Sequence, residues 1–392
     1  MGFFSKERLL LLFLGMFVAL TMIGFAVGPS IAERSFNPSP LQTLPPLSDD
    51  VADLHKSLTV ADLHADSLLW GRDLSVRSED GYVDISRLLE GNVALQMFTV
   101  VTKVPTPLQL EGNADDSDNI IKLALLQRWP VTTWSSLKSR ALYQARRLHN
   151  YARESSGQFS VIKTQGDLAA YLSARENNRQ LSAGLLGLEG AHALEGNLDN
   201  VDRLFDLGFR MIGLAHFFDN EVGSSAHGLK QERLTPFGRE VLKRSESLNM
   251  MIDLSHASVQ TIDDVLAIAR RPVMVSHTGV RGTCDNGRNL SDQQLQQIAQ
   301  TGGLVAIGFW STAVCGESVD DIVRAIAYTT DQIGIDHVAL GSDFDGAVQL
   351  PFDVANIGQV TKGLLEAGFT QEDIQKIMGL NAVRFLEKML PA

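Results

Sequence analysis

Cysteine and clustered positive charge are scarce in this sequence of 392 residues, which also has no internal repeat or low-complexity tract. It contains two cysteines, and its formal net charge is −12 with no cluster of Lys and Arg. Because binding to phosphate groups needs a basic surface, we do not expect nucleic acid as a partner. The hydrophobic content of 44% and the charged content of 20% are typical of a globular protein, and we expect the negative charge to favour solubility.

The two cysteines, Cys284 and Cys315, allow a single disulfide. An even number of cysteines favours a disulfide in an oxidising compartment, whereas two buried free thiols are the alternative. The choice therefore depends on whether the protein is exported, and the N-terminal sequence indicates that it is.

The N-terminal segment, residues 1–32, is expected to be a signal peptide or a membrane anchor. Lys6 and Arg8 precede an uncharged apolar stretch of 19 residues, 9–27, which is close to the roughly 20 residues that cross a bilayer. Ser30 and Ala32 are the small residues that a signal-peptidase site needs, so cleavage and retention both stay open. Either way, the positive charges stay on the cytoplasmic side, which places the rest of the chain in the periplasm or on the outer side of the membrane. The proline-rich residues 33–50 are expected to form a linker.

Short apolar runs recur along the rest of the chain, residues 51–392, and alternate with helical patterns. We expect eight strands, at residues 59–64, 93–101, 184–189, 210–215, 250–255, 272–276, 303–309 and 337–342. Apolar runs of this kind, bounded by Gly and polar residues, suit strands buried on both faces of a parallel sheet. Eight of them with intervening helices predict an α/β fold, the (β/α)₈ TIM barrel. Residues 102–183 interrupt the alternation and are expected to be a helical insertion after the second strand.

Most of these runs end in His, Asp or Glu, and the strand ends of a parallel barrel meet at one rim. Five such side chains are expected to bind metal: His64, Asp66, Glu189, His256 and His277. Ligands of the His and carboxylate types, without Cys, favour Zn²⁺ or a similar divalent ion. Five ligands exceed what a single catalytic zinc ion usually takes from protein, so we expect two ions about 3.5 Å apart with a bridging carboxylate.

The remaining histidines lack this context. His55, His149, His227 and His337 do not follow a strand, and we expect them to be structural or on the surface. His192 lies three residues after Glu189, where a role in orienting a metal ligand is open.

Eight segments, in order, resemble the membrane dipeptidase family, the renal dipeptidase type of metal-dependent amidohydrolase barrel. They extend over residues 59–385 and comprise Asp62-Leu-His-Ala-Asp66, Gly187-Leu-Glu-Gly190, Leu214-Ala-His216, Leu234-Thr-Pro-Phe-Gly238, Ile252-Asp-Leu-Ser-His-Ala-Ser258, Val275-Ser-His277, Arg288-Asn289 and Gly341-Ser-Asp-Phe-Asp-Gly346. Each segment alone is modest evidence, but the ordered set is specific. The resemblance implies that His64 and Asp66 hold one metal ion, that His256 and His277 hold the other, and that Glu189 bridges them.

The resemblance also implies roles for residues that the strand pattern does not assign. It implies that His216 binds the substrate and polarises its carbonyl, that Arg288 binds the substrate carboxylate, and that Asp343 carries protons. It further implies a disulfide between Cys284 and Cys315, and a homodimer.

We therefore expect a zinc-dependent dipeptidase, in which a hydroxide shared by two Zn²⁺ ions attacks the peptide carbonyl. Its partners would be a dipeptide or a similar small molecule, and the membrane if the N-terminal segment is retained. Two alternatives remain open: another binuclear amidohydrolase acting on a different amide or a lactone, and an exported tailoring or binding protein that hydrolyses no peptide. Arg288 favours the dipeptidase, because it requires a carboxylate beside the scissile bond.

Overall fold

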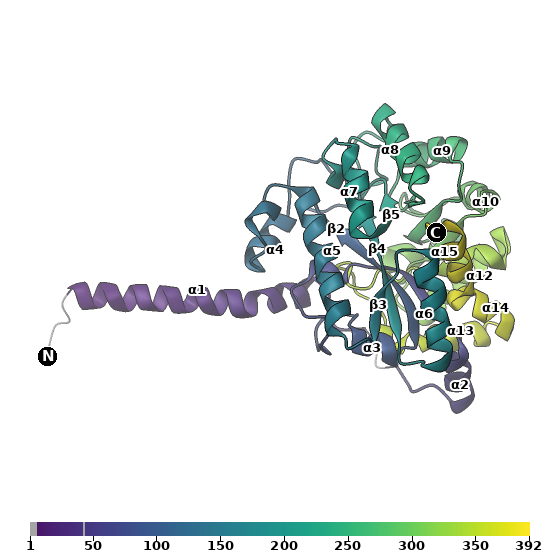
Figure 1. Ribbon diagram of the computed structural model, residues 1–392, viewed down its shortest axis with the longest axis horizontal. Coiled ribbons are helices and arrows are strands. Elements are labelled where there is room, and N and C mark those ends of the chain that lie inside the picture. The colour runs from purple at the N-terminus through teal and green to yellow at the C-terminus, as the bar shows by residue number, and fades with distance from the viewer. Residues whose placement is uncertain (1–5, 42–43) are drawn as a thin grey trace.

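The centre of the molecule is a barrel of parallel strands surrounded by helices, seen in a computed structural model that describes residues 6–41 and 44–392, with side chains from Leu10 onward (Figure 1). The strands are β1 (Val60–Ala65), β2 (Val93–Val101), β3 (Phe159–Val161), β4 (Ser182–Glu189), β5 (Phe209–Gly213), β6 (Met251–Asp253), β7 (Met274–Thr278), β8 (Leu304–Ile307) and β9 (Val338–Leu340). They are ordered β2-β1-β9-β8-β7-β6-β5-β4-β3, and β4 also pairs with β2. This second pairing closes eight of the strands into a ring, which confirms the predicted (β/α)₈ barrel.

All eight predicted strands are present, with ends within two residues of those expected. The ninth strand, β3, was not predicted, and it lies inside the segment that we expected to be a helical insertion. It pairs with the first residues of β4, Phe159 opposite Ser182 and Val161 opposite Gly184. Three residues are too few to show an alternating pattern, so the sequence carried no signal for this strand.

Apart from α1, the helices surround the barrel in the alternation that the sequence predicted (Figure 1). They are α1 (Lys6–Phe36), α2 (Asp49–Ser57), α3 (Ile85–Glu90), α4 (Ile120–Leu126), α5 (Leu137–Glu154), α6 (Gln165–Asn177), α7 (Asp199–Leu207), α8 (Pro236–Ser247), α9 (Val259–Ile268), α10 (Asp292–Gln300), α11 (Ser311–Val314), α12 (Val319–Ile333), α13 (Gly358–Glu366), α14 (Gln371–Gln375) and α15 (Asn381–Met389). Of these, α4, α5 and α6 belong to the insertion. The start of α8 follows from its sequence, because the Thr235 side chain accepts a hydrogen bond from the Gly238 backbone and Pro236 occupies the first turn.

The core has two layers that take alternate residues from the same strands. Ile212 and Ile252 belong to the large cluster that the outer helices cover. Their neighbours Met211 and Met251 belong to a second cluster, which also contains residues of α15. This alternation is what a barrel with a packed interior requires, because successive side chains of a strand point to opposite faces. The rim is thereby held rigidly at the strand ends.

The N-terminal helix α1 is a single 31-residue helix that extends away from the barrel (Figure 1). Its residues Leu10–Phe36 are long and apolar enough to cross a membrane. The helix runs beyond the predicted leader, residues 1–32, into the first residues of the predicted linker, 33–50. Residues 1–5 of that leader and 42–43 of that linker lie outside the described residues.

Candidate metal centre and active site

The five predicted metal ligands lie together at one rim of the barrel. His64 is in β1 and Asp66 follows that strand, Glu189 ends β4, His256 follows β6, and His277 is in β7. All five are buried, with exposed fractions of 6% or less. Because the strands are parallel, side chains that are far apart in the sequence reach the same point.

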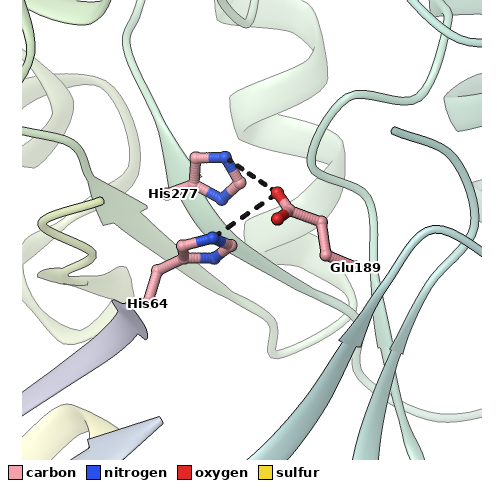
Figure 2. Close-up of side chains that lie close together, drawn as sticks. All are labelled: His64, Glu189 and His277. Atoms are coloured by element: carbon pink, nitrogen blue, oxygen red, sulfur yellow. Dashed lines mark ion pairs between the residues drawn. The ribbon is translucent and has the colours of Figure 1, made fainter. Parts of the chain in front are cut away.

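Glu189 is at the centre of this cluster. Its Oε1 atom lies 3.5 Å from Nε2 of His64 and 3.6 Å from Nε2 of His277 (Figure 2). The same oxygen lies 3.1 Å from Nε2 of His256 and 3.6 Å from Nε2 of His216. One carboxylate oxygen is therefore surrounded by four imidazole nitrogens.

The tautomers of His64 and His277 are set by one hydroxyl group, that of Ser276. This hydroxyl donates its hydrogen to Oδ2 of Asp253 at 2.6 Å, since a carboxylate only accepts. Its oxygen lies 2.9 Å from Nδ1 of His64 and 3.1 Å from Nδ1 of His277, and it must accept from both. Both rings thus carry their hydrogen on Nδ1 and point an unprotonated Nε2 toward Glu189, as metal-binding histidines do.

His227 fixes the tautomer of His256 in the same way. It is buried, so of the two options that the sequence left for it, surface or structural, the surface option is wrong. Nδ1 of His227 lies 2.5 Å from the Leu110 carbonyl and must donate to it. Burial, followed by the charge of Arg288, lowers the pKa of His227 to about 4, so the ring is neutral. Its Nε2 therefore accepts from Nδ1 of His256 at 2.9 Å, which leaves Nε2 of His256 free.

These groups fit divalent metal ions better than they fit one another. Nε2 of His256 and Nε2 of His277 lie 2.9 Å apart, although neither carries a hydrogen in the tautomers deduced above. Nε2 of His64 and Oε2 of Glu189 are buried without a hydrogen-bond partner. Three groups of three side chains have ligand atoms within 4.8 Å of one another: His64, Glu189 and His277; Glu189, His216 and His256; and His64, Asp66 and Asp343. A cation would satisfy lone pairs that otherwise face each other.

The pKa values of the groups in the metal-free site also favour the binding of a cation. Burial raises the pKa of Glu189 to about 8, and the charge of Asp253 adds to this. Burial and the nearby Glu189 raise the pKa of Asp66 well above its usual range. Burial also lowers the pKa values of His256 and His277 well below 6.5. The site thus favours neutral imidazoles and protonated carboxyl groups until a positive charge binds.

Asp343 and His256 share an unusual backbone conformation. Asp343 follows β9 and has a φ of +65°, and His256 has a φ of +61°. Left-handed conformations are costly for residues other than glycine, and they are retained where a side chain must be aimed at a site. Oδ1 of Asp343 lies 3.9 Å from Nε2 of His64. Burial, with Asp66 and Glu189 nearby, raises the pKa of Asp343 well above its usual range.

Arg288 is a buried residue of the rim, with 7% exposure. Its guanidinium donates to the His277 carbonyl at 2.8 Å and lies 5.6 Å from the centre of the Trp310 ring. Burial lowers its pKa to about 10 against the raising effect of the nearby carboxylates, so it remains a cation at neutral pH. Its loop is closed by a disulfide between Cys284 and Cys315, whose Cα atoms are 5.2 Å apart.

A pocket of about 290 Å³ lies over this cluster. Its polar floor consists of Asp66, Glu189, His216, His227, His256, His277, Arg288 and Asp343. Apolar side chains form its walls, among them Leu108 and Leu110 of the insertion and Trp310. The pocket therefore holds every residue assigned to metal, substrate or proton transfer except His64, which is fully buried beneath it.

The other histidines lie outside this cluster. His192 is buried with its Nε2 3.0 Å from the Thr102 hydroxyl, and no hydrogen bond joins it to a predicted ligand. His55, His149 and His337 each contact a backbone carbonyl, at 3.0, 2.8 and 2.8 Å respectively. Contacts of this kind between a ring and the backbone support the fold.

Three residues that support the cluster were not singled out from the sequence: Asp253, Ser276 and His227. Asp253 did leave a signal, because it is a charged residue inside the buried run Met251–Asp253. Ser276 lies next to His277, but a serine in a strand is unremarkable. His227 lies in the loop between β5 and α8, and only its folded position reveals it.

Comparison with known proteins agrees with the geometry of this site. A family model described as membrane dipeptidase, peptidase family M19, matches residues 48–390. The chain belongs to the membrane dipeptidase family. This confirms the family and the enzyme class that the sequence predicted, a hydrolase of the metallopeptidase type, and the family implies a bound metal and a small peptide substrate.

Named relatives agree with this assignment. Dipeptidase tcpJ of Claviceps purpurea is 29% identical over 324 residues, covering 79% of this chain and 69% of the relative. Dipeptidase ataJ of Aspergillus terreus is 27% identical over 340 residues, covering 79% of this chain and 77% of the relative. The crystal structure of the probable dipeptidase PvdM from Pseudomonas aeruginosa has a TM-score of 0.72 at 19% identity, covering 87% of this chain and 98% of that one, and it supports the fold.

Proposed function

We propose that this family member is a dipeptidase that uses two zinc ions. The observation that carries the proposal is the position of Oε1 of Glu189, within 3.6 Å of Nε2 of His64, His216, His256 and His277. Four imidazoles around one buried carboxylate oxygen fit a carboxylate that bridges two ions.

The chain divides its ligands between two metal positions. His64 and Asp66 would hold one ion, His256 and His277 the other, and Glu189 both. When bound, two Zn²⁺ ions supply a nucleophilic hydroxide near neutral pH and polarise the substrate carbonyl. The contribution of the protein is to present unprotonated nitrogens, through Ser276, Asp253 and His227.

Substrate recognition is assigned to His216 and Arg288. The Arg288 guanidinium lines the pocket and would bind the carboxylate of a dipeptide through paired hydrogen bonds. His216 faces Glu189 and would donate to the substrate carbonyl as negative charge develops there. A pocket of about 290 Å³ suits short substrates.

Proton transfer is assigned to Asp343. Its carboxyl group lies at the edge of the cluster, 3.9 Å from Nε2 of His64, and lines the pocket. It would accept a proton during attack and deliver it to the leaving amine. A raised pKa favours such a role, because the group must hold a proton between the two steps.

The wider organisation of the chain is part of the proposal. Residues 1–32 would be a signal or anchor, 33–50 a linker, and 51–392 the catalytic barrel, exported to the periplasm or held on the outer side of the membrane. The homodimer implied by the family resemblance is retained as an expectation.

The test is hydrolysis of a panel of dipeptides, including those with D-residues, by purified protein. We expect hydrolysis that a chelator abolishes and that added zinc restores. Hydrolysis of lactones or N-acyl amides with no activity on any dipeptide would favour the other amidohydrolase class. Absence of all these activities in a zinc-loaded protein would favour a non-hydrolytic role.

A further inference from the structure

The last turns of α1 pack against the catalytic rim of the barrel. The rings of Phe36 and Trp70 lie 6.1 Å apart, and Oδ1 of Asn37 accepts a hydrogen bond from the Ala347 backbone at 2.9 Å. Glu33 forms a buried ion pair with Arg72. These contacts hold the base of the helix against the loops after β1 and β9, so the direction of α1 is fixed relative to the pocket.

Arg72, the partner of Glu33, also contacts the loop that carries Asp343. Arg72 also pairs with Asp345, whose Oδ1 accepts from the Tyr82 backbone at 2.6 Å. The Asp345 carbonyl accepts from the Trp70 indole at 2.7 Å. The packing also reaches back into the predicted leader, because the Ser30 hydroxyl donates a hydrogen bond to the Asp80 carboxylate. Cleavage after Ala32 would discard this contact.

The residue at which α1 would leave a bilayer can be found by counting the residues of the apolar span. No charged residue occurs between Arg8 and Glu33, and about 20 residues cross the hydrocarbon core. A span that begins at Leu9 therefore ends near Gly28. At this residue α4 meets α1, because a Cβ added to Gly28 would lie 2.7 Å from Cδ1 of Leu126. Figure 1 shows α4 on the side of the barrel from which α1 emerges.

Exposed apolar side chains are concentrated in the insertion beside this point. Beyond α1, the described residues include 11 exposed large hydrophobic side chains, and five of them lie within residues 102–134. Three belong to α4 and the turn after it: Leu125, Val131 and Trp134, with exposed fractions of 42%, 69% and 39%. We call these three residues the α4 patch.

We propose that α1 is retained as a membrane anchor and that the α4 patch rests on the same bilayer, as a second contact. An exposed tryptophan beside exposed aliphatic residues, at the level where a span ends, matches the preference of Trp for the membrane–water interface. The other two exposed residues of the insertion, Leu108 and Leu110, line the pocket. The α4 patch and part of the pocket wall thus belong to the same insertion.

The test uses the full chain in phosphatidylcholine vesicles whose acyl chains carry bromine, which quenches nearby tryptophan. The other three tryptophans, Trp70, Trp129 and Trp310, are buried, with exposures of 2%, 2% and 8%. We expect bromine placed near the headgroups to quench the fluorescence more strongly than bromine placed deep in the chains. Trp134→Phe should remove most of this quenching. Equal emission in brominated and plain vesicles, or the same quenching in Trp134→Phe, would overturn the proposal.

A pair of matched variants separates membrane contact from misfolding. Val131→Asp should reduce the quenching of Trp134 by at least half, whereas Ile268→Asp on α9, away from α1 in Figure 1, should leave it unchanged. Equal effects of the two variants would contradict the proposal. The mass of the protein isolated from the membrane should include α1, and a chain that begins at Glu33 would overturn the retained anchor. None of these readouts depends on dipeptidase activity.

Discussion

Nε2 of His227 lies 2.9 Å from Nδ1 of His256, and this contact determines which nitrogen of His256 faces the proposed metal. His227→Leu removes the acceptor and leaves a buried N–H group without a partner. We expect metal affinity to fall by about 10- to 100-fold, as when other residues that orient a metal-bound histidine are removed.

The matched controls for this prediction are His227→Gln and His337→Leu. Gln can accept from His256 while its amide donates to the Leu110 carbonyl, so it should restore much of the affinity. Among the residues that the structure describes, the His337 ring hydrogen-bonds to the Gly303 carbonyl at 2.8 Å and to no predicted metal ligand, so its replacement should not change metal binding. Zinc titration against a competing chelator measures all three variants, and equal losses in His227→Leu and His337→Leu would exclude the orienting role.

Asp343→Asn should retain the metal ions and lose turnover. The variant keeps the size of the side chain but cannot accept and return a proton, so we expect kcat to fall by about 10²- to 10⁴-fold, the usual contribution of a general acid–base group. Metal analysis of the same preparation is the control. Because Asp343 also lies within ligand distance of His64 and Asp66, loss of metal in this variant would make it a ligand and end its assignment as proton carrier.

Arg288→Ala should weaken hydrolysis of dipeptides by at least about tenfold in kcat/KM, through loss of charge-assisted hydrogen bonds worth about 1.5–3 kcal/mol. Dipeptide amides lack the carboxylate, so they should be poor substrates of the native enzyme and change little in the variant. Arg288→Lys should rescue only in part, since Lys keeps the charge without the planar fork. If native enzyme hydrolysed free and amidated dipeptides equally well, Arg288 would have no role in carboxylate recognition.

Metal binding should depend on pH with a defined sign. In the metal-free site, burial and the charge of Asp253 raise the pKa of Glu189 to about 8, so this carboxyl is mostly protonated at about pH 6.5. A metal ion binds the ionised form, so binding must release a proton, and affinity should rise by up to about tenfold per pH unit until about pH 8. The histidine ligands contribute less to this release, because burial lowers their pKa values.

Calorimetric titration of the metal-free protein in two buffers of different ionisation enthalpy counts the protons. We expect at least one proton released per chain at about pH 6.5 and fewer at about pH 9. Metal binding with no proton release at the lower pH would contradict the raised pKa.

The sequence was sufficient to predict the barrel and the position of the site, because both depend on local patterns. Each strand is a short apolar run, and parallel strands must bring their ends to one rim. His64, Glu189, His256 and His277 could therefore be grouped although they are spread over more than 200 residues.

The parts that could not be predicted depend on contacts between distant loops. His227 acquires its role only because the insertion places the Leu110 carbonyl on one side of its ring and β6 places His256 on the other. Asp253 and Ser276 act through a hydroxyl shared between neighbouring strands, which no single-strand pattern reveals. Likewise, the contact between Glu33 and Arg72 joins a segment that composition alone marks as a linker to a loop of the barrel.

Elemental analysis of the zinc-reconstituted protein tests whether Glu189 bridges two metal ions. We expect two zinc ions per chain in the native enzyme. In Glu189→Gln, which keeps the shape of the side chain but removes its charge, we expect lower metal content and no dipeptidase activity. One zinc ion or none in the native enzyme would contradict a binuclear site. Two zinc ions in Glu189→Gln, whether or not the variant is active, would contradict the bridging role of Glu189.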